Sequence, residues 1–299
     1  MIISQHATDG SSRQPRLEIF QATWAMVELP HPSHPWSLQE AVDWIGDEGF
    51  GGALHWVADA DADFPAVARI RRSGLLVGVG FPAYEDTSVG PLAERAQDLG
   101  VSFLNAQVHD AFVSDARAIA RLDAMYEACD AIGMPLFIET HRGTVTQDLL
   151  RTIEYGRQVP RIRFTLDASH YMVAGEVTQP DAAPCFTEAL SEIIGRSSSI
   201  HARVSNGEQV QVDIGDGTGP VVSPYLGWWA SAYRHWLRAA AAGGFLPFVC
   251  ELGPRPYAIT APSGSPFPMG AELSDRRAQA LVFKRIAERI RDSGPALLE

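Results

Sequence analysis

Eight short apolar runs recur along the chain, and enough residues separate neighbouring runs to form a helix. The runs are continuously apolar rather than alternating, which is typical of parallel strands covered on both faces. Eight strand–helix units in 299 residues predict an α/β fold, a single (β/α)8 TIM barrel. The predicted strands begin at Leu17, Phe50, Leu75, Val101, Pro135, Ile162, Ser198 and Leu246.

A doubly wound open sheet is the alternative fold. Such sheets usually carry a glycine-rich phosphate-binding loop after the first strand. The first predicted strand instead ends in Thr23, Trp24, Ala25 and Met26, with no GxGxxG or GxxxxGK pattern. The barrel is therefore favoured over the open sheet.

Capping residues and periodicity predict the helices. Ser37, with Glu40 three residues later, has the pattern of a capping box. Ser114 opens a second helix, which Gly133 ends. Near the C-terminus four apolar residues recur every four positions, which predicts an amphipathic closing helix; they are Ala278, Val282, Ile286 and Ile290.

Two segments fall outside the repeating pattern. Residues 1–15 are polar and predict a flexible N-terminal leader before a barrel over residues 16–299. Residues 205–229, after the seventh predicted strand, predict a long glycine-rich loop. Long loops inside compact domains are usually functional or disordered, so this loop is either a lid or a tolerated surface insertion.

Charge and hydropathy exclude several classes of protein. The formal net charge of −12 argues against a nucleic-acid partner, because such proteins usually carry a basic surface. No apolar run approaches the roughly 18 residues that span a membrane, and the N-terminus lacks the pattern of a signal peptide. The three cysteines lie far apart, which argues against a disulfide framework. The sequence therefore predicts a cytoplasmic protein.

Four consecutive predicted strands end in an ionisable residue after an otherwise apolar run. These residues are Glu139, Asp167, His201 and Glu251. The C-terminal strand ends of a TIM barrel form the active site, so three carboxylates and one imidazole are expected to converge there. A divalent metal would offset their charge, and we take Mn²⁺ as the preferred ion with Mg²⁺, Co²⁺ or Zn²⁺ as alternatives. The competing interpretation is that each residue forms an ordinary ion pair.

Other polar and aromatic residues fall near the same predicted rim. His170 lies three residues after Asp167, in the loop that follows the sixth predicted strand, and Arg203 lies two residues after His201 on the seventh. We predict that six residues contact substrate: His170, Arg203, Arg142, His55, His109 and Trp24. Asn105 and Gln107 also fall near the rim.

The segments ETHRG, TLDASH, IHARV and CELGP resemble the xylose isomerase-like TIM-barrel superfamily of sugar phosphate isomerases and epimerases. The resemblance covers about residues 16–292 and implies Glu139, Asp167, His201 and Glu251 as metal ligands. Two departures matter. Asp213 is followed by Ile214 and Gly215, so the Asp-x-His of the endonuclease branch is missing, and Val145 stands where ketose 3-epimerases would carry a second Glu.

Together these features predict a metal-dependent sugar isomerase or epimerase that moves a proton next to a carbonyl through an enediolate. Glu139 and Glu251 are the predicted acid–base pair. One alternative is a lyase that dehydrates a keto-inositol or oxidised sugar, and another is a non-catalytic sugar-binding barrel. The predicted partner is a small sugar, with unphosphorylated substrates favoured because ELGPRPY holds a single glycine. Barrels of this type often dimerise, so a homodimer is also considered.

Overall fold

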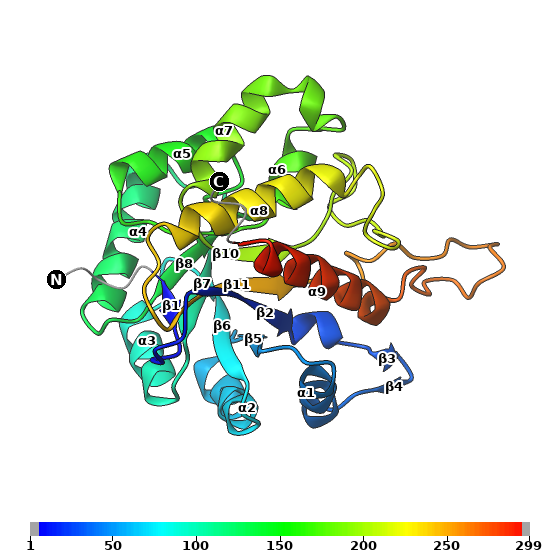
Figure 1. Ribbon diagram of the computed structural model, residues 1–299, viewed down its shortest axis with the longest axis horizontal. Coiled ribbons are helices and arrows are strands. Elements are labelled where there is room, and N and C mark those ends of the chain that lie inside the picture. Colours follow the sequence, from blue (N-terminus) through cyan, green and yellow to red (C-terminus); the bar gives the residue numbers. More distant parts are fainter. Residues whose placement is uncertain (1–5, 295–299) are drawn as a thin grey trace.

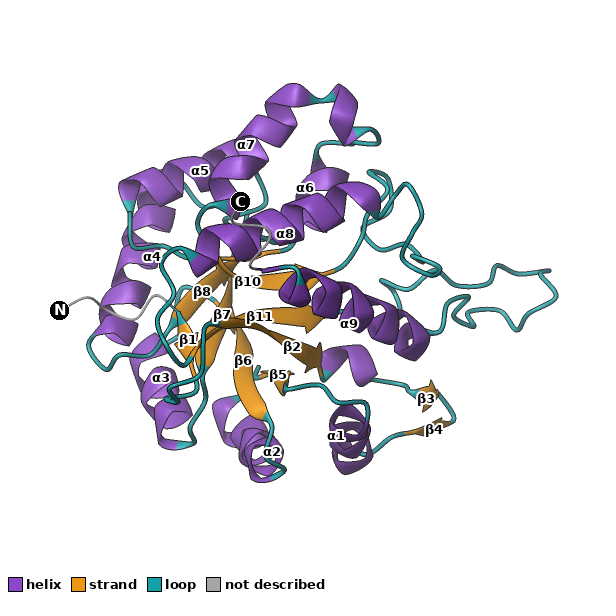
Figure 2. Ribbon diagram, viewed as in Figure 1, coloured by secondary structure: helices purple, strands orange, loops and turns teal. Residues whose placement is uncertain are grey.

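The computed structural model describes residues 6–294. Eight parallel strands close into a barrel, because β11 pairs both with β10 and with the first barrel strand, β2 (Figures 1 and 2). This confirms the predicted TIM barrel and the order of its strands. They are β2 (Arg16–Ala22), β5 (Gly52–Trp56), β6 (Leu76–Ala83), β7 (Phe103–Val108), β8 (Leu136–Glu139), β9 (Phe164–Leu166), β10 (Ser197–Ala202) and β11 (Gly244–Cys250).

Helices surround the barrel, and each helix packs one of its faces against the strands (Figure 2). The capping box predicted at Ser37 is present, because its side chain accepts from the Glu40 amide and Glu40 bonds back to Ser37. The helices are α1 (Leu38–Asp47), α2 (Ala60–Arg72), α3 (Val89–Asp98), α4 (Asp115–Asp130), α5 (Leu149–Gln158), α6 (Ala168–Ala174), α7 (Pro184–Ile194), α8 (Ser223–Leu237) and α9 (Arg276–Asp292). Short elements are η1 (Trp24–Met26), η2 (Pro180–Ala182) and the hairpin of β3 (Pro30–His31) and β4 (His34–Pro35).

The segment expected to be a flexible leader is partly built into the sheet. β1 (Ala7–Thr8) pairs antiparallel with the first two residues of β11, and Ala7 is buried. This pairing is available because β10 joins β11 only from Phe248 onward, which leaves the start of β11 with a free edge. Residues 1–5 of the predicted leader, and residues 295–299, lie outside the described part of the chain.

Phenylalanines fill the barrel interior below the strand ends. Phe20 stacks on Phe245 at 5.8 Å between ring centroids, and it contacts Phe103 edge-on at 5.6 Å. Gly52 and Gly78 make room for these rings, since a Cβ there would lie 2.4 Å from Phe20 and 2.3 Å from Phe103. The lower interior is therefore largely apolar, and the buried ionisable residues Glu139, Asp167, His201 and Glu251 lie toward the C-terminal strand ends.

Two loops extend over that end of the barrel. The loop predicted over 205–229 is shorter, because α8 begins at Ser223 and buries Trp228 and Trp229 on its inner face. Gln211 holds this loop by accepting from the Gly253 amide at 2.7 Å and donating to the Gly253 carbonyl at 3.1 Å. The second loop, residues 251–275, was not singled out in the sequence; it reaches out from the barrel on the side of the β3–β4 hairpin (orange in Figure 1).

Among residues 6–294, the helices are all too short or too polar to cross a bilayer.

Candidate active site

The four predicted strand-end residues meet in one buried cluster. Glu139, Asp167, His201 and Glu251 each offer a ligand atom, and these atoms all lie within 4.8 Å of one another. Each residue stands within one residue of the end of its own strand, from β8 to β11. The parallel arrangement brings the four ends to one rim, as the sequence predicted. This cluster could hold a metal ion.

Glu139 is held rigidly by neighbours on β7. Asn105 donates to its Oε2 at 2.7 Å and Gln107 donates to its Oε1 at 3.0 Å. Burial acts to raise the pKa of this carboxyl, but the attraction of His201 and its hydrogen bonds outweigh burial and lower the pKa to about 2. Glu139 is therefore ionised and has both carboxylate oxygens engaged.

Asp167 caps the short helix α6 and faces Arg203. Its Oδ1 accepts from the Ser169 amide at 3.0 Å, and its Oδ2 lies 2.9 Å from the Arg203 guanidinium. Burial raises the pKa of Asp167 to about 6, although Arg203 opposes that rise. Arg203 is itself 1 % exposed and also lies 3.2 Å from Glu251, so one buried cation joins two of the carboxylates.

His201 supplies the observation that tests whether a metal fits. Its Nδ1 lies 2.7 Å from Glu251 and 3.6 Å from Glu139, yet neither ring nitrogen makes a hydrogen bond of acceptable geometry within the described chain. Buried polar atoms are normally satisfied. An imidazole with unsatisfied nitrogens among three carboxylates is a donor set that suits a divalent cation. The residues present therefore fit a metal.

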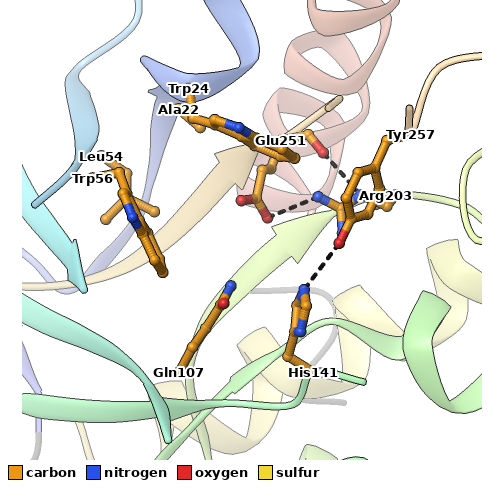
Figure 3. Close-up of a pocket in the computed structure, with 9 residues that line it drawn as sticks. All are labelled: Ala22, Trp24, Leu54, Trp56, Gln107, His141, Arg203, Glu251 and Tyr257. Atoms are coloured by element: carbon orange, nitrogen blue, oxygen red, sulfur yellow. Dashed lines mark hydrogen bonds and ion pairs between the residues drawn. The ribbon is translucent and has the colours of Figure 1, made fainter. Parts of the chain in front are cut away.

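A cavity of about 250 Å³ opens beside this cluster (Figure 3). Glu251 and Arg203 line one part of it, while Gln107 and His141 lie across from them. Aromatic side chains form much of the remaining wall. They are Trp24, Trp56 and Tyr257, with Ala22 and Leu54 completing the lining. Glu139 does not line the cavity, which agrees with its 1 % exposure.

His141 and Tyr257 form a polar pair at this cavity. The His141 Nε2 and the Tyr257 hydroxyl are 3.2 Å apart, and the His141 ring lies 3.9 Å from the ring of His170. Burial lowers the pKa of His141 and raises that of Tyr257. The imidazole and the phenol are thus both neutral near pH 7. Arg203 lies over the Tyr257 ring at 4.9 Å.

Of the six residues predicted to contact substrate, two line the cavity and the others do not. Trp24 and Arg203 line the cavity, and His170 is buried behind Arg203, 3.0 Å from it. Arg142 lies over the Tyr257 ring at 5.1 Å and does not line the cavity. His55 bonds to the Thr23 hydroxyl at 2.8 Å and does not line this cavity.

His109 does not line the cavity beside the cluster. It stacks on Tyr84 at 4.9 Å and lines a different groove, beside α4. It lies one residue beyond the end of β7. Sequence reasoning had not selected His141, Trp56 or Tyr257. His141 lay within the quoted ETHRG segment, but Tyr257 sits in an irregular loop that carries no periodic signal.

Comparison with solved structures identifies the fold of this chain. No family model and no curated protein sequence matches the chain. Among solved structures, a xylose isomerase-like TIM barrel protein from Mycobacterium smegmatis, in complex with magnesium, matches with a TM-score of 0.57 and 12% identity, covering 95% of this chain and 98% of that one. The chain has the fold of the xylose isomerase-like TIM barrels. The expected resemblance is thereby confirmed at the level of the fold.

Two further structures share this fold. One is 3-keto-D-glucoside 4-epimerase from E. coli, with a TM-score of 0.55, 11% identity and coverage of 91% of this chain and 100% of that one. The other is the probable 3-DHS dehydratase AsbF from Bacillus anthracis, with a TM-score of 0.54, 13% identity and the same coverages.

Proposed function

We propose that this protein is a divalent-metal-dependent isomerase or epimerase of a keto sugar. The observation that carries the proposal is the buried cluster of three carboxylates and one imidazole beside an aromatic-walled cavity. Proton transfer next to a carbonyl needs an electrophile, a base and an acid in one site. Similar folds include a named epimerase and a complex with magnesium, which agrees with this chemistry.

Charge supports a metal in the cluster. The three carboxylates carry −3 and Arg203 contributes +1, so a divalent cation with neutral His201 would bring the sum to zero. Glu139, Asp167, His201 and Glu251 would hold the cation. When bound, it would supply Lewis acidity toward a carbonyl oxygen. Mn²⁺ is the ion we propose, because carboxylate oxygens with one imidazole suit it.

The proton-transfer groups follow from access to the cavity. Glu251 borders it, so we assign this carboxylate as the base that removes the proton next to the carbonyl. Glu139 was also an acid–base candidate, but both its oxygens are engaged and it is closed off from the cavity, so we assign it as a metal ligand only. His141 lies across the cavity and is the proposed second proton carrier, on the other face of the sugar.

A dehydratase remains the second candidate because of Tyr257. Its hydroxyl bonds to His141 and lines the cavity, and burial keeps the phenol protonated by raising its pKa. A neutral phenol can donate a proton to a leaving hydroxyl group. A protein with the same fold is a probable dehydratase, which agrees with this alternative.

Incubating the Mn²⁺-loaded protein with keto sugars in D₂O tests the proposal. Deuterium incorporation with an otherwise retained mass supports the epimerase, and loss of water supports the dehydratase. His141→Gln is expected to lower exchange by about 10²–10⁴-fold while bound metal is unchanged. Glu94→Gln, on the exposed face of α3, is the matched control. Sugar binding with neither reaction would favour a non-catalytic barrel and refute the proposal.

A further inference from the structure

A second cavity lies next to the one beside the metal cluster. It measures about 310 Å³ and we call it the flanking pocket. Trp24 and Trp56 line both cavities, so the two are neighbours with shared walls. The remaining residues of the flanking pocket are Thr23, Met26, Val27, Trp36, Ser37, Leu38, Ala41 and His55.

The lining of the flanking pocket is aromatic and carries no carboxylate, lysine or arginine. Three tryptophans contribute to it: Trp24, Trp36 and Trp56. The hydroxyl of Ser37 is used by the Glu40 carboxylate at 2.8 Å, and that of Thr23 by His55. Such a site suits a neutral ring that presents an apolar face.

One polar group remains for a ligand. Thr23 holds His55 through Nδ1, and within the described chain no hydrogen bond to the His55 Nε2 is present. Pockets for small molecules are typically apolar with a few polar groups that fix orientation. His55 was predicted to contact substrate, and it would do so here rather than in the cavity beside Glu251.

The wall of the flanking pocket is fixed before any ligand arrives. Arg276, at the start of α9, donates to the carbonyls of Ala25 and Val27, and it is 3 % exposed. Arg276 is held in turn by Glu272 at 2.7 Å. Because these bonds tie the η1 segment to α9, Trp24 and its neighbours form a preorganised surface. Preorganisation lowers the cost of binding.

We propose that the substrate is a glycoside, with its reacting sugar beside Glu251 and a second, neutral ring in the flanking pocket. This rests on the proposed function for the identity of the reacting sugar. A glycosidic bond locks the anomeric carbon as an acetal, which leaves no carbonyl there. The ketone that the proposed chemistry needs must therefore lie on another carbon of the same sugar ring.

Unreactive glucosides test the second-ring site without depending on catalysis. Calorimetry would compare methyl and phenyl glucosides, in both anomers, on the intact Mn²⁺-loaded protein. We expect at least one phenyl anomer to bind about tenfold more tightly than its methyl counterpart. Trp36→Ala should remove most of that preference and leave the methyl glucoside affinity unchanged, which also shows that the variant is folded. Trp36→Phe should keep the preference.

A control variant sharpens the test. Phe112→Ala, an aromatic that is 91% exposed and remote from the flanking pocket, should behave like the unmodified protein. Equal binding of phenyl and methyl glucosides, or a preference that survives Trp36→Ala, would overturn the inference.

Failure of the two proposals would look different. If free keto sugars exchange deuterium but the phenyl preference is absent, the second-ring site is wrong and the proposed reaction stands. If the preference depends on Trp36 but no keto sugar or keto glycoside reacts, the site for the second ring stands and the reaction is wrong.

Discussion

Replacing Arg203 with Met should destabilise the protein strongly when metal is absent. Arg203 is 1 % exposed and lies 2.9 Å from Asp167 and 3.2 Å from Glu251. Removing one partner of a buried ion pair typically costs about 3–5 kcal/mol, because the remaining charge is left uncompensated. Methionine has a similar length and packs adaptably, so the lost charge dominates over lost volume. At about 2 °C per kcal/mol for a chain of this size, the melting temperature should fall by roughly 6–10 °C.

The assay is thermal and urea unfolding in EDTA, repeated with saturating Mn²⁺. In Arg203→Met, added Mn²⁺ should raise stability at least as much as in the unmodified protein, since the cation meets carboxylates that have lost their arginine. Arg277→Met serves as the matched control, because its ion pair with Asp275 is much more exposed. An Arg203→Met protein that melts in EDTA at the unmodified temperature would refute the assignment of Arg203 as the cation that balances the cluster.

Three other predictions address the metal, a loop and pH. Asp167→Asn should lose most bound Mn²⁺ by mass spectrometry; undiminished metal would place the ion elsewhere. Gln211→Ala should cost about 1–3 kcal/mol in urea unfolding and speed proteolysis after β10, since it breaks two buried bonds to Gly253; unchanged cleavage would contradict this. Burial lowers the pKa of His6 to about 4. When the pH is lowered from 6.5 to 4, the free energy of unfolding should therefore decrease, because the unfolded chain takes up a proton at His6 before the folded chain does. The free energy of unfolding of His6→Gln should decrease less steeply over this pH range. Parallel curves of unfolding free energy against pH for the two proteins would contradict the lowered pKa of His6.

The barrel could be predicted because its strands are buried on both faces. Continuous apolar runs such as the one from Leu246 mark such strands directly, and all eight starting points fall within or just before the observed strands. Segment boundaries were harder to predict. Trp228 and Trp229 belong to the buried face of α8, so the predicted loop was drawn too long. Ala7 pairs with a free edge of β11 that no local pattern reveals.

The residues of the candidate site also fall into two groups, those that could be predicted from the sequence and those that could not. Strand-end residues such as Glu139 and His201 were predictable because the topology of a parallel barrel sends every strand end to one rim. His109 lines a groove beside α4 rather than the cavity beside Glu251, and no sequence pattern distinguishes it from strand-end residues that do reach the cluster. Tyr257 comes from a loop whose path depends on tertiary contacts, and only the structure brings it to the cavity.

The strand-end residues and the aromatic wall residues have different expected roles, the first in the reaction and the second in the choice of substrate. The cluster around Glu251 is built by strands and balanced by Arg203, so its charge sets which reactions are feasible there. The aromatic walls come mostly from a loop and from η1, which Arg276 ties to α9, together with Trp56 at the end of β5, so we expect them to set which sugar reaches the cluster. Changing Trp36 should therefore alter the choice of substrate and leave the metal in place, whereas changing Asp167 should do the reverse. Loops can vary among barrels without disturbing the balanced charges beneath them.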